Sequence, residues 1–241
     1  MAVRLDTPLE SRRSPDLSRR WPRLLLGLVL GYGVFELSAR ALGSDRGQMG
    51  LVVGALVVAV VVCAERVLFR RPWTAIGREL GLGAALLLVI PVFLAARGAP
   101  ASPHPGWPWL LPGLFAQAGV AEETLFRGYL FRHVRQGRTF GRAALVAAVP
   151  FVAVHLAMFL TLPWPIALAS VVLAALISVP LAYLFELGGD TIWAPALVHF
   201  VVQGAIKLVD VPGEAGQVLP LVWLAASAVL PWAVFLVPRR R

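Results

Sequence analysis

The sequence predicts an all-α, polytopic membrane protein with about eight transmembrane helices and both termini in the cytoplasm. The chain of 241 residues is 59% hydrophobic and only 15% charged, and its mean hydropathy is +0.77. Many of its uncharged runs are long enough to cross about 30 Å of hydrocarbon as helices. The arginines are concentrated between alternate apolar runs, as in proteins whose loops alternate between the two sides of a membrane.

The apolar runs follow one another with short connections, and no connection is long enough to form a separate soluble domain. The chain therefore divides into an Arg-rich cytoplasmic tail, residues 1–23, and a single helical membrane domain, residues 24–241. The predicted spans are residues 24–41, 49–67, 80–96, 109–131, 143–160, 166–187, 192–209 and 218–237.

The first predicted span follows an Arg-rich tail, as the apolar part of a signal peptide would. Because seven further spans come after it, we interpret it as a retained helix. Pairs of glycines four residues apart occur in or beside the first three spans, beginning with Gly27 and Gly31. Such spacing permits close packing between helices, and we assign these glycines to helix packing.

Positive charge orients the spans, because basic residues near span ends are mostly cytoplasmic. The N-terminal tail, the second and fourth loops and the C-terminus contain most of the arginines. The opposite loops have only Arg40, Arg46, Arg97 and Lys207. This distribution accounts for the formal charge of +9, so we expect a lipid bilayer as partner and no nucleic acid. Lys207 is the only lysine, which is typical of a GC-rich bacterial gene, and we expect a multi-pass protein of a bacterial inner membrane.

Ionisable side chains well inside the spans come to a similar depth on three different helices. At 1.5 Å per helical residue, Glu122 lies about 15 Å from the cytoplasmic edge and His155 about 18 Å. On the seventh span, His199 lies about 10 Å deep and Gln203 about 17 Å. An intramembrane ionisable group is costly unless it is paired or hydrated, so it indicates a functional site by default. We therefore predict a polar cavity that opens toward the cytoplasm.

Spacing along each helix suggests a role for each residue. Glu123 and Arg127 are four residues apart, so they share a helix face and can neutralise each other. Glu122 is rotated by about 100° from Glu123, which leaves it free to act as a general base or acid in the cavity. His199 and Gln203 also share a face and can donate two hydrogen bonds toward one oxyanion.

Each of these residues also has a structural interpretation. The two glutamates and the arginine can form an ion-pair network, each histidine can make an interior hydrogen bond, and Gln203 can hold two helices together. Glu36, in the first span, has no partner at matching depth and is interpreted as structural. The chain contains no HExxH zinc motif and no G-x-S-x-G nucleophile motif, so activation of water by Glu and His is the remaining hydrolytic chemistry.

Three motifs in order resemble those of the CAAX protease and bacteriocin-processing (CPBP, or Abi) family of membrane proteins. The family pattern is EExxxR, then FxxxH, then HxxxN or HxxxD on successive spans. This chain has Glu122-Glu123-Thr-Leu-Phe-Arg127, Phe151-Val-Ala-Val-His155 and His199-Phe-Val-Val-Gln203. The resemblance covers about residues 109–209 and implies an intramembrane endopeptidase that acts on a peptide or protein substrate.

The resemblance also implies roles for the matched residues. Glu122 and His155 would activate water, while His199 and the residue at position 203 would stabilise the oxyanion. Glu123, Arg127 and Phe151 would support the site. Family members are described both as zinc metalloproteases and as metal-free glutamate proteases. The cofactor is therefore either zinc, held by Glu122, His155 and His199, or none, since two His and one Glu suit both chemistries.

One position departs from the family pattern, because Gln203 stands where Asn or Asp is usual. The added methylene moves the amide by about 1.5 Å, and a misplacement near 1 Å can reduce a rate by about 10²-fold. The leading hypothesis is an endopeptidase that hydrolyses a peptide bond near the cytoplasmic side of the membrane. The alternative is a non-catalytic CPBP-type scaffold or bacteriocin-immunity factor, and a third hypothesis is a proton-coupled transporter that uses the Glu and His side chains as a relay.

Overall fold

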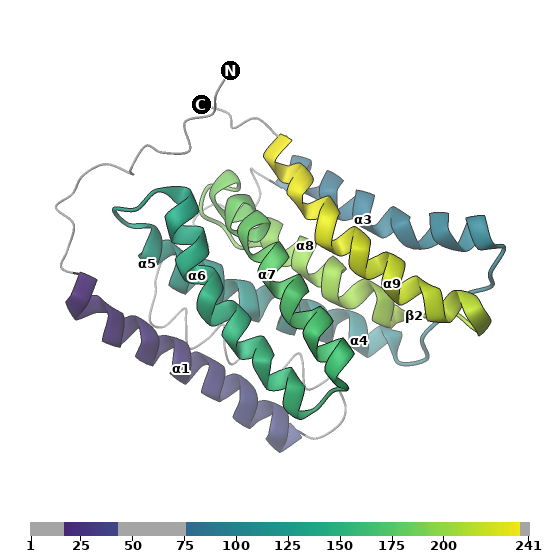
Figure 1. Cartoon of the computed structure of the whole chain (residues 1–241), viewed down its shortest axis with the longest axis horizontal. Coiled ribbons are helices and arrows are strands. Elements are labelled where there is room, and N and C mark those ends of the chain that lie inside the picture. The colour runs from purple at the N-terminus through teal and green to yellow at the C-terminus, as the bar shows by residue number, and fades with distance from the viewer. Residues whose placement is uncertain (1–16, 43–75, 237–241) are drawn as a thin grey trace.

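The computed structural model describes residues 17–42 and 76–236, and nearly all of them are helical (Figure 1). The all-α class predicted from the sequence is therefore confirmed. The predicted span at residues 49–67 lies outside the described residues, as do the first sixteen residues, the last five and the side chain of Glu36.

A helix occurs at each predicted span that the described residues cover. Except for α8, each helix starts before the apolar run that predicted it, because hydropathy detects the lipid-soluble part of a helix and not its capped end. The helices that extend over these spans are α1 (Leu17–Leu42), α3 (Ile76–Arg97), α4 (Trp107–Leu114), η1 (Phe115–Ala121), η2 (Thr124–Phe131), α5 (Arg132–Arg135), α6 (Phe140–His155), η3 (Leu156–Leu160), α7 (Trp164–Leu187), α8 (Trp193–Gly204), η4 (Ala205–Leu208), α9 (Gly213–Val229) and η5 (Leu230–Leu236).

Within the described ranges, three helices are long and apolar enough to cross a membrane: Phe140–Leu160, Trp164–Leu187 and Gly213–Leu236. Shorter apolar helices occur at Leu24–Gly33, Ala85–Arg97 and Trp193–Leu208. These lengths and compositions agree with a membrane protein. The count of eight spans and the cytoplasmic position of both termini stay predictions.

The fourth predicted span is a continuous helix whose central part is π-helical. The predicted depth of Glu122 uses the rise of an ordinary α-helix there. The backbone N–H of Glu122 donates to the carbonyl of Gln117, and that of Arg132 donates to the carbonyl of Arg127. These are the i to i+5 bonds of a π-helix, which is rare and frequent at functional sites. The two acids lie between the π-helical segments η1 and η2.

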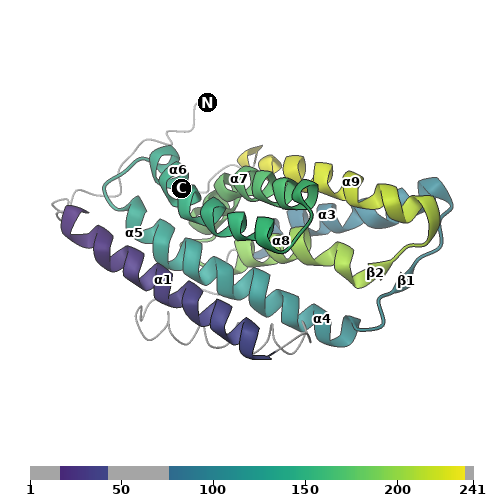
Figure 2. The same ribbon diagram turned by 60° about the horizontal axis from the view of Figure 1, so that its bottom comes forward.

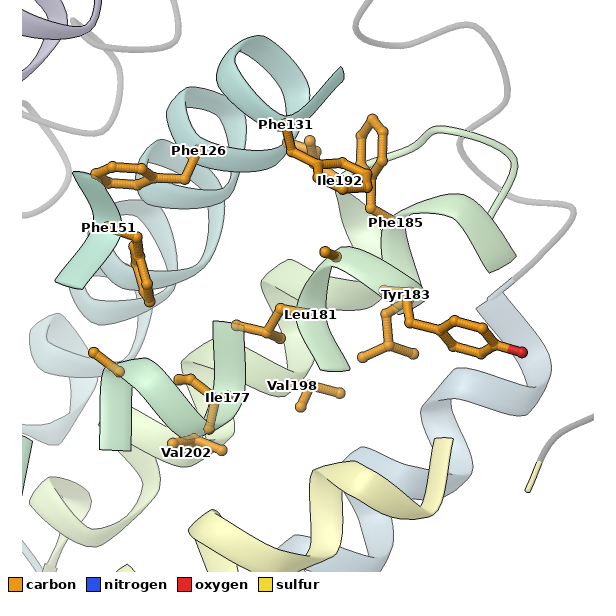
Figure 3. Packing of buried hydrophobic residues seen from close by; sticks show 14 of the residues in the cluster. Phe126, Phe131, Phe151, Ile177, Leu181, Tyr183, Phe185, Ile192, Val198 and Val202 are labelled. Carbon is orange, nitrogen blue, oxygen red and sulfur yellow. The ribbon is translucent and has the colours of Figure 1, made fainter. Parts of the chain in front are cut away.

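The hydrophobic core lies where η2, α6, α7 and α8 meet, and aromatic rings fill much of it (Figure 3). Phe126 of η2 contacts Phe151 of α6 edge to face, with ring centroids 4.9 Å apart. Phe131 of η2 makes a similar contact with Phe185 of α7 at 6.0 Å. These four side chains are at most 2% exposed, so the packing holds η2 against α6, which carries His155, and against α7.

Helix α1 runs along the helix that contains η2, on the opposite side of the bundle from α3 and α9 (Figure 2). Two glycines of α1 face it. A Cβ atom on Gly27 would lie 2.3 Å from the hydroxyl of Tyr129, and one on Gly31 would lie 2.8 Å from a methyl group of Leu125. The close helix contact predicted for this pair is therefore present.

The connections between helices meet at two ends of the bundle. At one end, β1 (Ser102–Pro103) pairs antiparallel with β2 (Val209–Asp210), at the right of Figure 2. At the other end, Arg135 of α5 donates to Glu186 of α7 at 2.5 Å. In the predicted topology, the two partners of each pairing lie on the same side of the membrane.

Candidate active site

Glu123 is the buried centre of the polar cluster. Its side chain is 0% exposed, and its Oε1 accepts hydrogen bonds from Nη1 of Arg127 at 2.9 Å and from Nδ1 of His199 at 2.6 Å. The contact with Arg127 agrees with their spacing of four residues. The contact with His199 joins the helix that contains η1 and η2 to α8, so this carboxylate connects two of the three helices that contribute polar residues.

Glu122 has a different environment from its neighbour. Its side chain is 14% exposed, and its Oε2 lies 3.9 Å from Nε2 of His199. That distance is too long for a hydrogen bond, but a single water molecule can bridge two polar groups across such a gap. The two adjacent acids are therefore unequal, as their different helix faces predict: Glu123 accepts two hydrogen bonds, and Glu122 is close to an imidazole without bonding it directly.

The His199 contacts were only partly predictable from the sequence. The depth of His199 matches that of the acids, but the spacing along α8 couples it to Gln203 and not to Glu123. Because Nδ1 donates to Glu123, the neutral ring has a free lone pair on Nε2. In the protonated ring, Nε2 is a second donor, and the carboxylates of Glu122 and Glu123 together balance the charges of His199 and Arg127.

His155 is held in one orientation at the end of α6. Its Nδ1 donates to the backbone carbonyl of Phe151 at 2.7 Å, which fixes the tautomer and leaves Nε2 of the neutral ring as an acceptor. His155 is 9% exposed. Its position and tautomer suit a group that accepts a proton or holds a water molecule.

Phe151 brings the three helices of the cluster into contact. Its ring centroid is 4.8 Å from that of His155 and 5.8 Å from that of His199. The guanidinium carbon of Arg127 lies 4.2 Å above the same ring, in the geometry of a cation–π contact. Figure 3 shows this ring beside Phe126 in the core. The residues from the three predicted motifs thus gather around one buried aromatic side chain.

Gln203 lies four residues after His199 on α8 and is half-buried. Its Oε1 is buried and has no hydrogen-bond partner within the part of the chain that the structure describes. The same holds for Oε2 of Glu123, Nη2 of Arg127 and Oγ1 of Thr124. Buried polar atoms normally have a partner, so these atoms are available to a water molecule or to a peptide group.

The geometry of the two histidines fits both cofactor alternatives. Among the described residues, no group of three His, Cys, Asp or Glu side chains is placed to hold a metal ion. The Nδ1 atoms of His155 and His199 are bonded to Phe151 and Glu123, which leaves Nε2 of each ring free. A histidine that binds zinc usually makes such a second hydrogen bond, and a histidine that holds a water molecule can make it as well.

Apolar helices around a buried cluster of two acids, two imidazoles and one arginine define a helical membrane protein with a polar site inside its bundle. Residues 104–205 match the family model described as type II CAAX prenyl endopeptidase Rce1-like. This match agrees with the CAAX protease and bacteriocin-processing family that the three motifs predict. No curated protein and no solved structure matches the chain.

The family match includes every residue of the three motifs, from Glu122 to Gln203. The match supports a CAAX-type protease in a membrane. The particular catalytic roles of the matched residues stay predictions, since the match assigns no role to individual residues.

Proposed function

We propose that the protein is an intramembrane endopeptidase that hydrolyses a peptide bond near the cytoplasmic side of a bacterial inner membrane. The observation that carries this proposal is the placement of His199 between two acids. Nδ1 of His199 bonds Glu123 at 2.6 Å, and Nε2 lies 3.9 Å from Glu122. One acid thus orients the imidazole, while the other stays free to act on water.

The proposed reaction begins with a water molecule held by Glu122 and by Nε2 of His155. Its oxygen bonds to the carbonyl carbon of the substrate, and its proton moves to the Glu122 carboxylate. The carbonyl oxygen becomes an oxyanion, which accepts hydrogen bonds from Nε2 of protonated His199 and from the Gln203 amide. The carbon–nitrogen bond then breaks, and Glu122 returns its proton to the leaving amine.

The substrate class is a peptide or protein segment that reaches the bundle from the cytoplasmic side. CAAX prenylation is not expected in most bacteria, so the family description does not identify the substrate. A suitable assay therefore presents the purified protein, in lipid vesicles, with a library of internally quenched peptides, each prepared with and without a C-terminal lipid. Mass spectrometry of the products identifies the cleaved bond.

In this assay, Glu122→Ala and His155→Ala are each expected to abolish cleavage, because each removes a group that acts on the water. Loss of a general acid or base reduces a rate by about 10²–10⁴-fold. The matched controls are Glu214→Ala and His104→Ala. They change an exposed glutamate and an exposed histidine at the end of the bundle where β1 pairs with β2. Cleavage that survives both site substitutions would exclude the proposed reaction.

The same assay separates the two cofactor alternatives. If the protein groups suffice, a chelator leaves the rate unchanged and metal analysis of the active protein finds no stoichiometric zinc. A rate that falls with chelator and returns with zinc would instead assign the water activation to a metal ion.

Gln203 is expected to contribute to the oxyanion site despite its departure from the family pattern. Gln203→Ala is expected to reduce kcat by about 10²-fold or more, the usual effect of removing one oxyanion donor. Gln203→Asn keeps the amide but moves it by about 1.5 Å, so its kcat is expected to lie between those of Gln203→Ala and the wild type. The measurement is kcat and KM for the three proteins, and an unchanged kcat in Gln203→Ala would remove Gln203 from the site.

The departure at Gln203 also motivates a second candidate function. A CPBP-type scaffold or bacteriocin-immunity factor would bind a partner without using an activated water molecule. Its function would then persist in a Glu122→Gln variant, whereas that of a protease would not.

A further inference from the structure

The backbones of η1 and α8 lie close together near the polar cluster, at a glycine. Gly119 of η1 is buried against α8. A Cβ atom on Gly119 would lie 2.8 Å from the backbone carbonyl oxygen of Ala196, 3.3 Å from a ring atom of Phe115 and 3.4 Å from Cβ of Phe200. The first distance is shorter than real Cβ contacts. A backbone oxygen cannot rotate away, so any side chain here must push the two helices apart.

This contact lies directly beside the contacts of His199 with the acids. Gly119 is three residues before Glu122, and Ala196 is three residues before His199. The hydrogen bond from Nδ1 of His199 to Glu123 is only 2.6 Å long, and both side chains are almost completely buried. A separation of η1 and α8 by several tenths of an ångström would therefore lengthen this bond and move Nε2 of His199 relative to Glu122.

We propose that Gly119 is a positioning residue of the site: its lack of a side chain sets the distance between η1 and α8 at which His199 bonds Glu123 and faces Glu122. The effect of Gly119 on catalysis rests on the proposed function. Its effect on the His199 contact does not, and can be measured separately.

The chain offers a matched control for this position. Gly141 is also a helical glycine, on α6, but a Cβ atom there would meet nothing within 4 Å. Gly119→Ala and Gly141→Ala therefore make the same chemical change, with a backbone collision in the first and none in the second. Phe115→Leu is a milder change at the same contact, since the ring of Phe115 on η1 packs edge to face against Phe200 on α8, with ring centroids 5.6 Å apart.

The test combines kinetics with ¹⁵N NMR of the full-length protein labelled at histidine, in lipid vesicles. The imidazole signals of His199 are identified by their loss in His199→Gln. In Gly119→Ala, we expect these signals to move away from their wild-type positions as the bond to Glu123 lengthens. We also expect kcat to fall by about tenfold with little change in KM, because the helices separate by several tenths of an ångström and a misplacement near 1 Å costs about 10²-fold. Gly141→Ala should match the wild type in both measurements.

The outcomes distinguish the positioning role of Gly119 from the protease assignment. If the wild type cleaves peptides and Gly119→Ala matches Gly141→Ala in signals and kcat, the positioning role is wrong and the protease assignment stands. If no peptide is cleaved but the His199 signals still change only in Gly119→Ala, the positioning role stands and the protease assignment fails. Should Gly119→Ala not fold, Phe115→Leu decides, because it changes the other side-chain contact between η1 and α8 at this point: shifted His199 signals support the role of the helix separation, and unchanged signals overturn it.

Discussion

Glu122→Gln is expected to abolish peptide cleavage while the protein stays folded. The amide has nearly the shape of the carboxylate but cannot accept a proton from water, so we expect a loss of about 10²–10⁴-fold in kcat. Folding should be little affected, because the Glu122 side chain is partly exposed and its contact with His199 is 3.9 Å long. The measurements are initial cleavage rates and thermal unfolding of the same purified samples.

The matched control for this substitution is Glu214→Gln, which changes a side chain that is 83% exposed on α9. It should keep wild-type activity. Cleavage by Glu122→Gln within tenfold of the wild type would show that Glu122 is not the base. In cells, full function of a Glu122→Gln protein that cleaves no peptide would favour the scaffold or immunity hypothesis.

Glu123→Ala is expected to lower the free energy of unfolding of the protein strongly. It removes the carboxylate that accepts hydrogen bonds from Arg127 and His199, and Arg127 is only 2% exposed. Removing one partner of a buried ion pair leaves an uncompensated charge and costs about 3–5 kcal/mol. The measurement is the free energy of unfolding in detergent micelles.

The companion to this prediction is the double substitution Glu123→Ala with Arg127→Met. Because it removes both charges, its loss should be smaller than the sum of the two single losses. The exposed pair between Arg97 and Glu214, 3.9 Å apart, serves as the control, and Glu214→Ala should cost about 0–1 kcal/mol. Additive losses for the Glu123 and Arg127 substitutions would contradict the buried pairing.

Much of the fold could be predicted because a membrane makes simple demands on sequence. A span must be a helix with a long apolar surface, so hydropathy located a helix at each span that the described residues cover. The contact between Glu123 and Arg127 was equally predictable, since residues four apart on one helix are neighbours whatever surrounds them. Three motifs in chain order then indicated the family that the match over residues 104–205 supports.

The helical geometry around the acids could not be predicted in the same way. Hydropathy and four-residue spacing do not distinguish a π-helix from an α-helix, because both give a continuous apolar helix. The π-helical segments η1 and η2 depend on packing against α8 and α6, and no single stretch of sequence contains that information.

The sequence by itself determined the helical membrane class, the polar residues inside the apolar helices and the local pair between Glu123 and Arg127. Only the tertiary structure decided that His199 bonds Glu123, that Phe151 lies between the histidines and Arg127, and that Gly119 brings η1 against α8. The physical reason is the range of the interactions. Periodicity and spacing act along one helix, whereas the rotation and separation of two helices follow from the side chains of both, packed against each other.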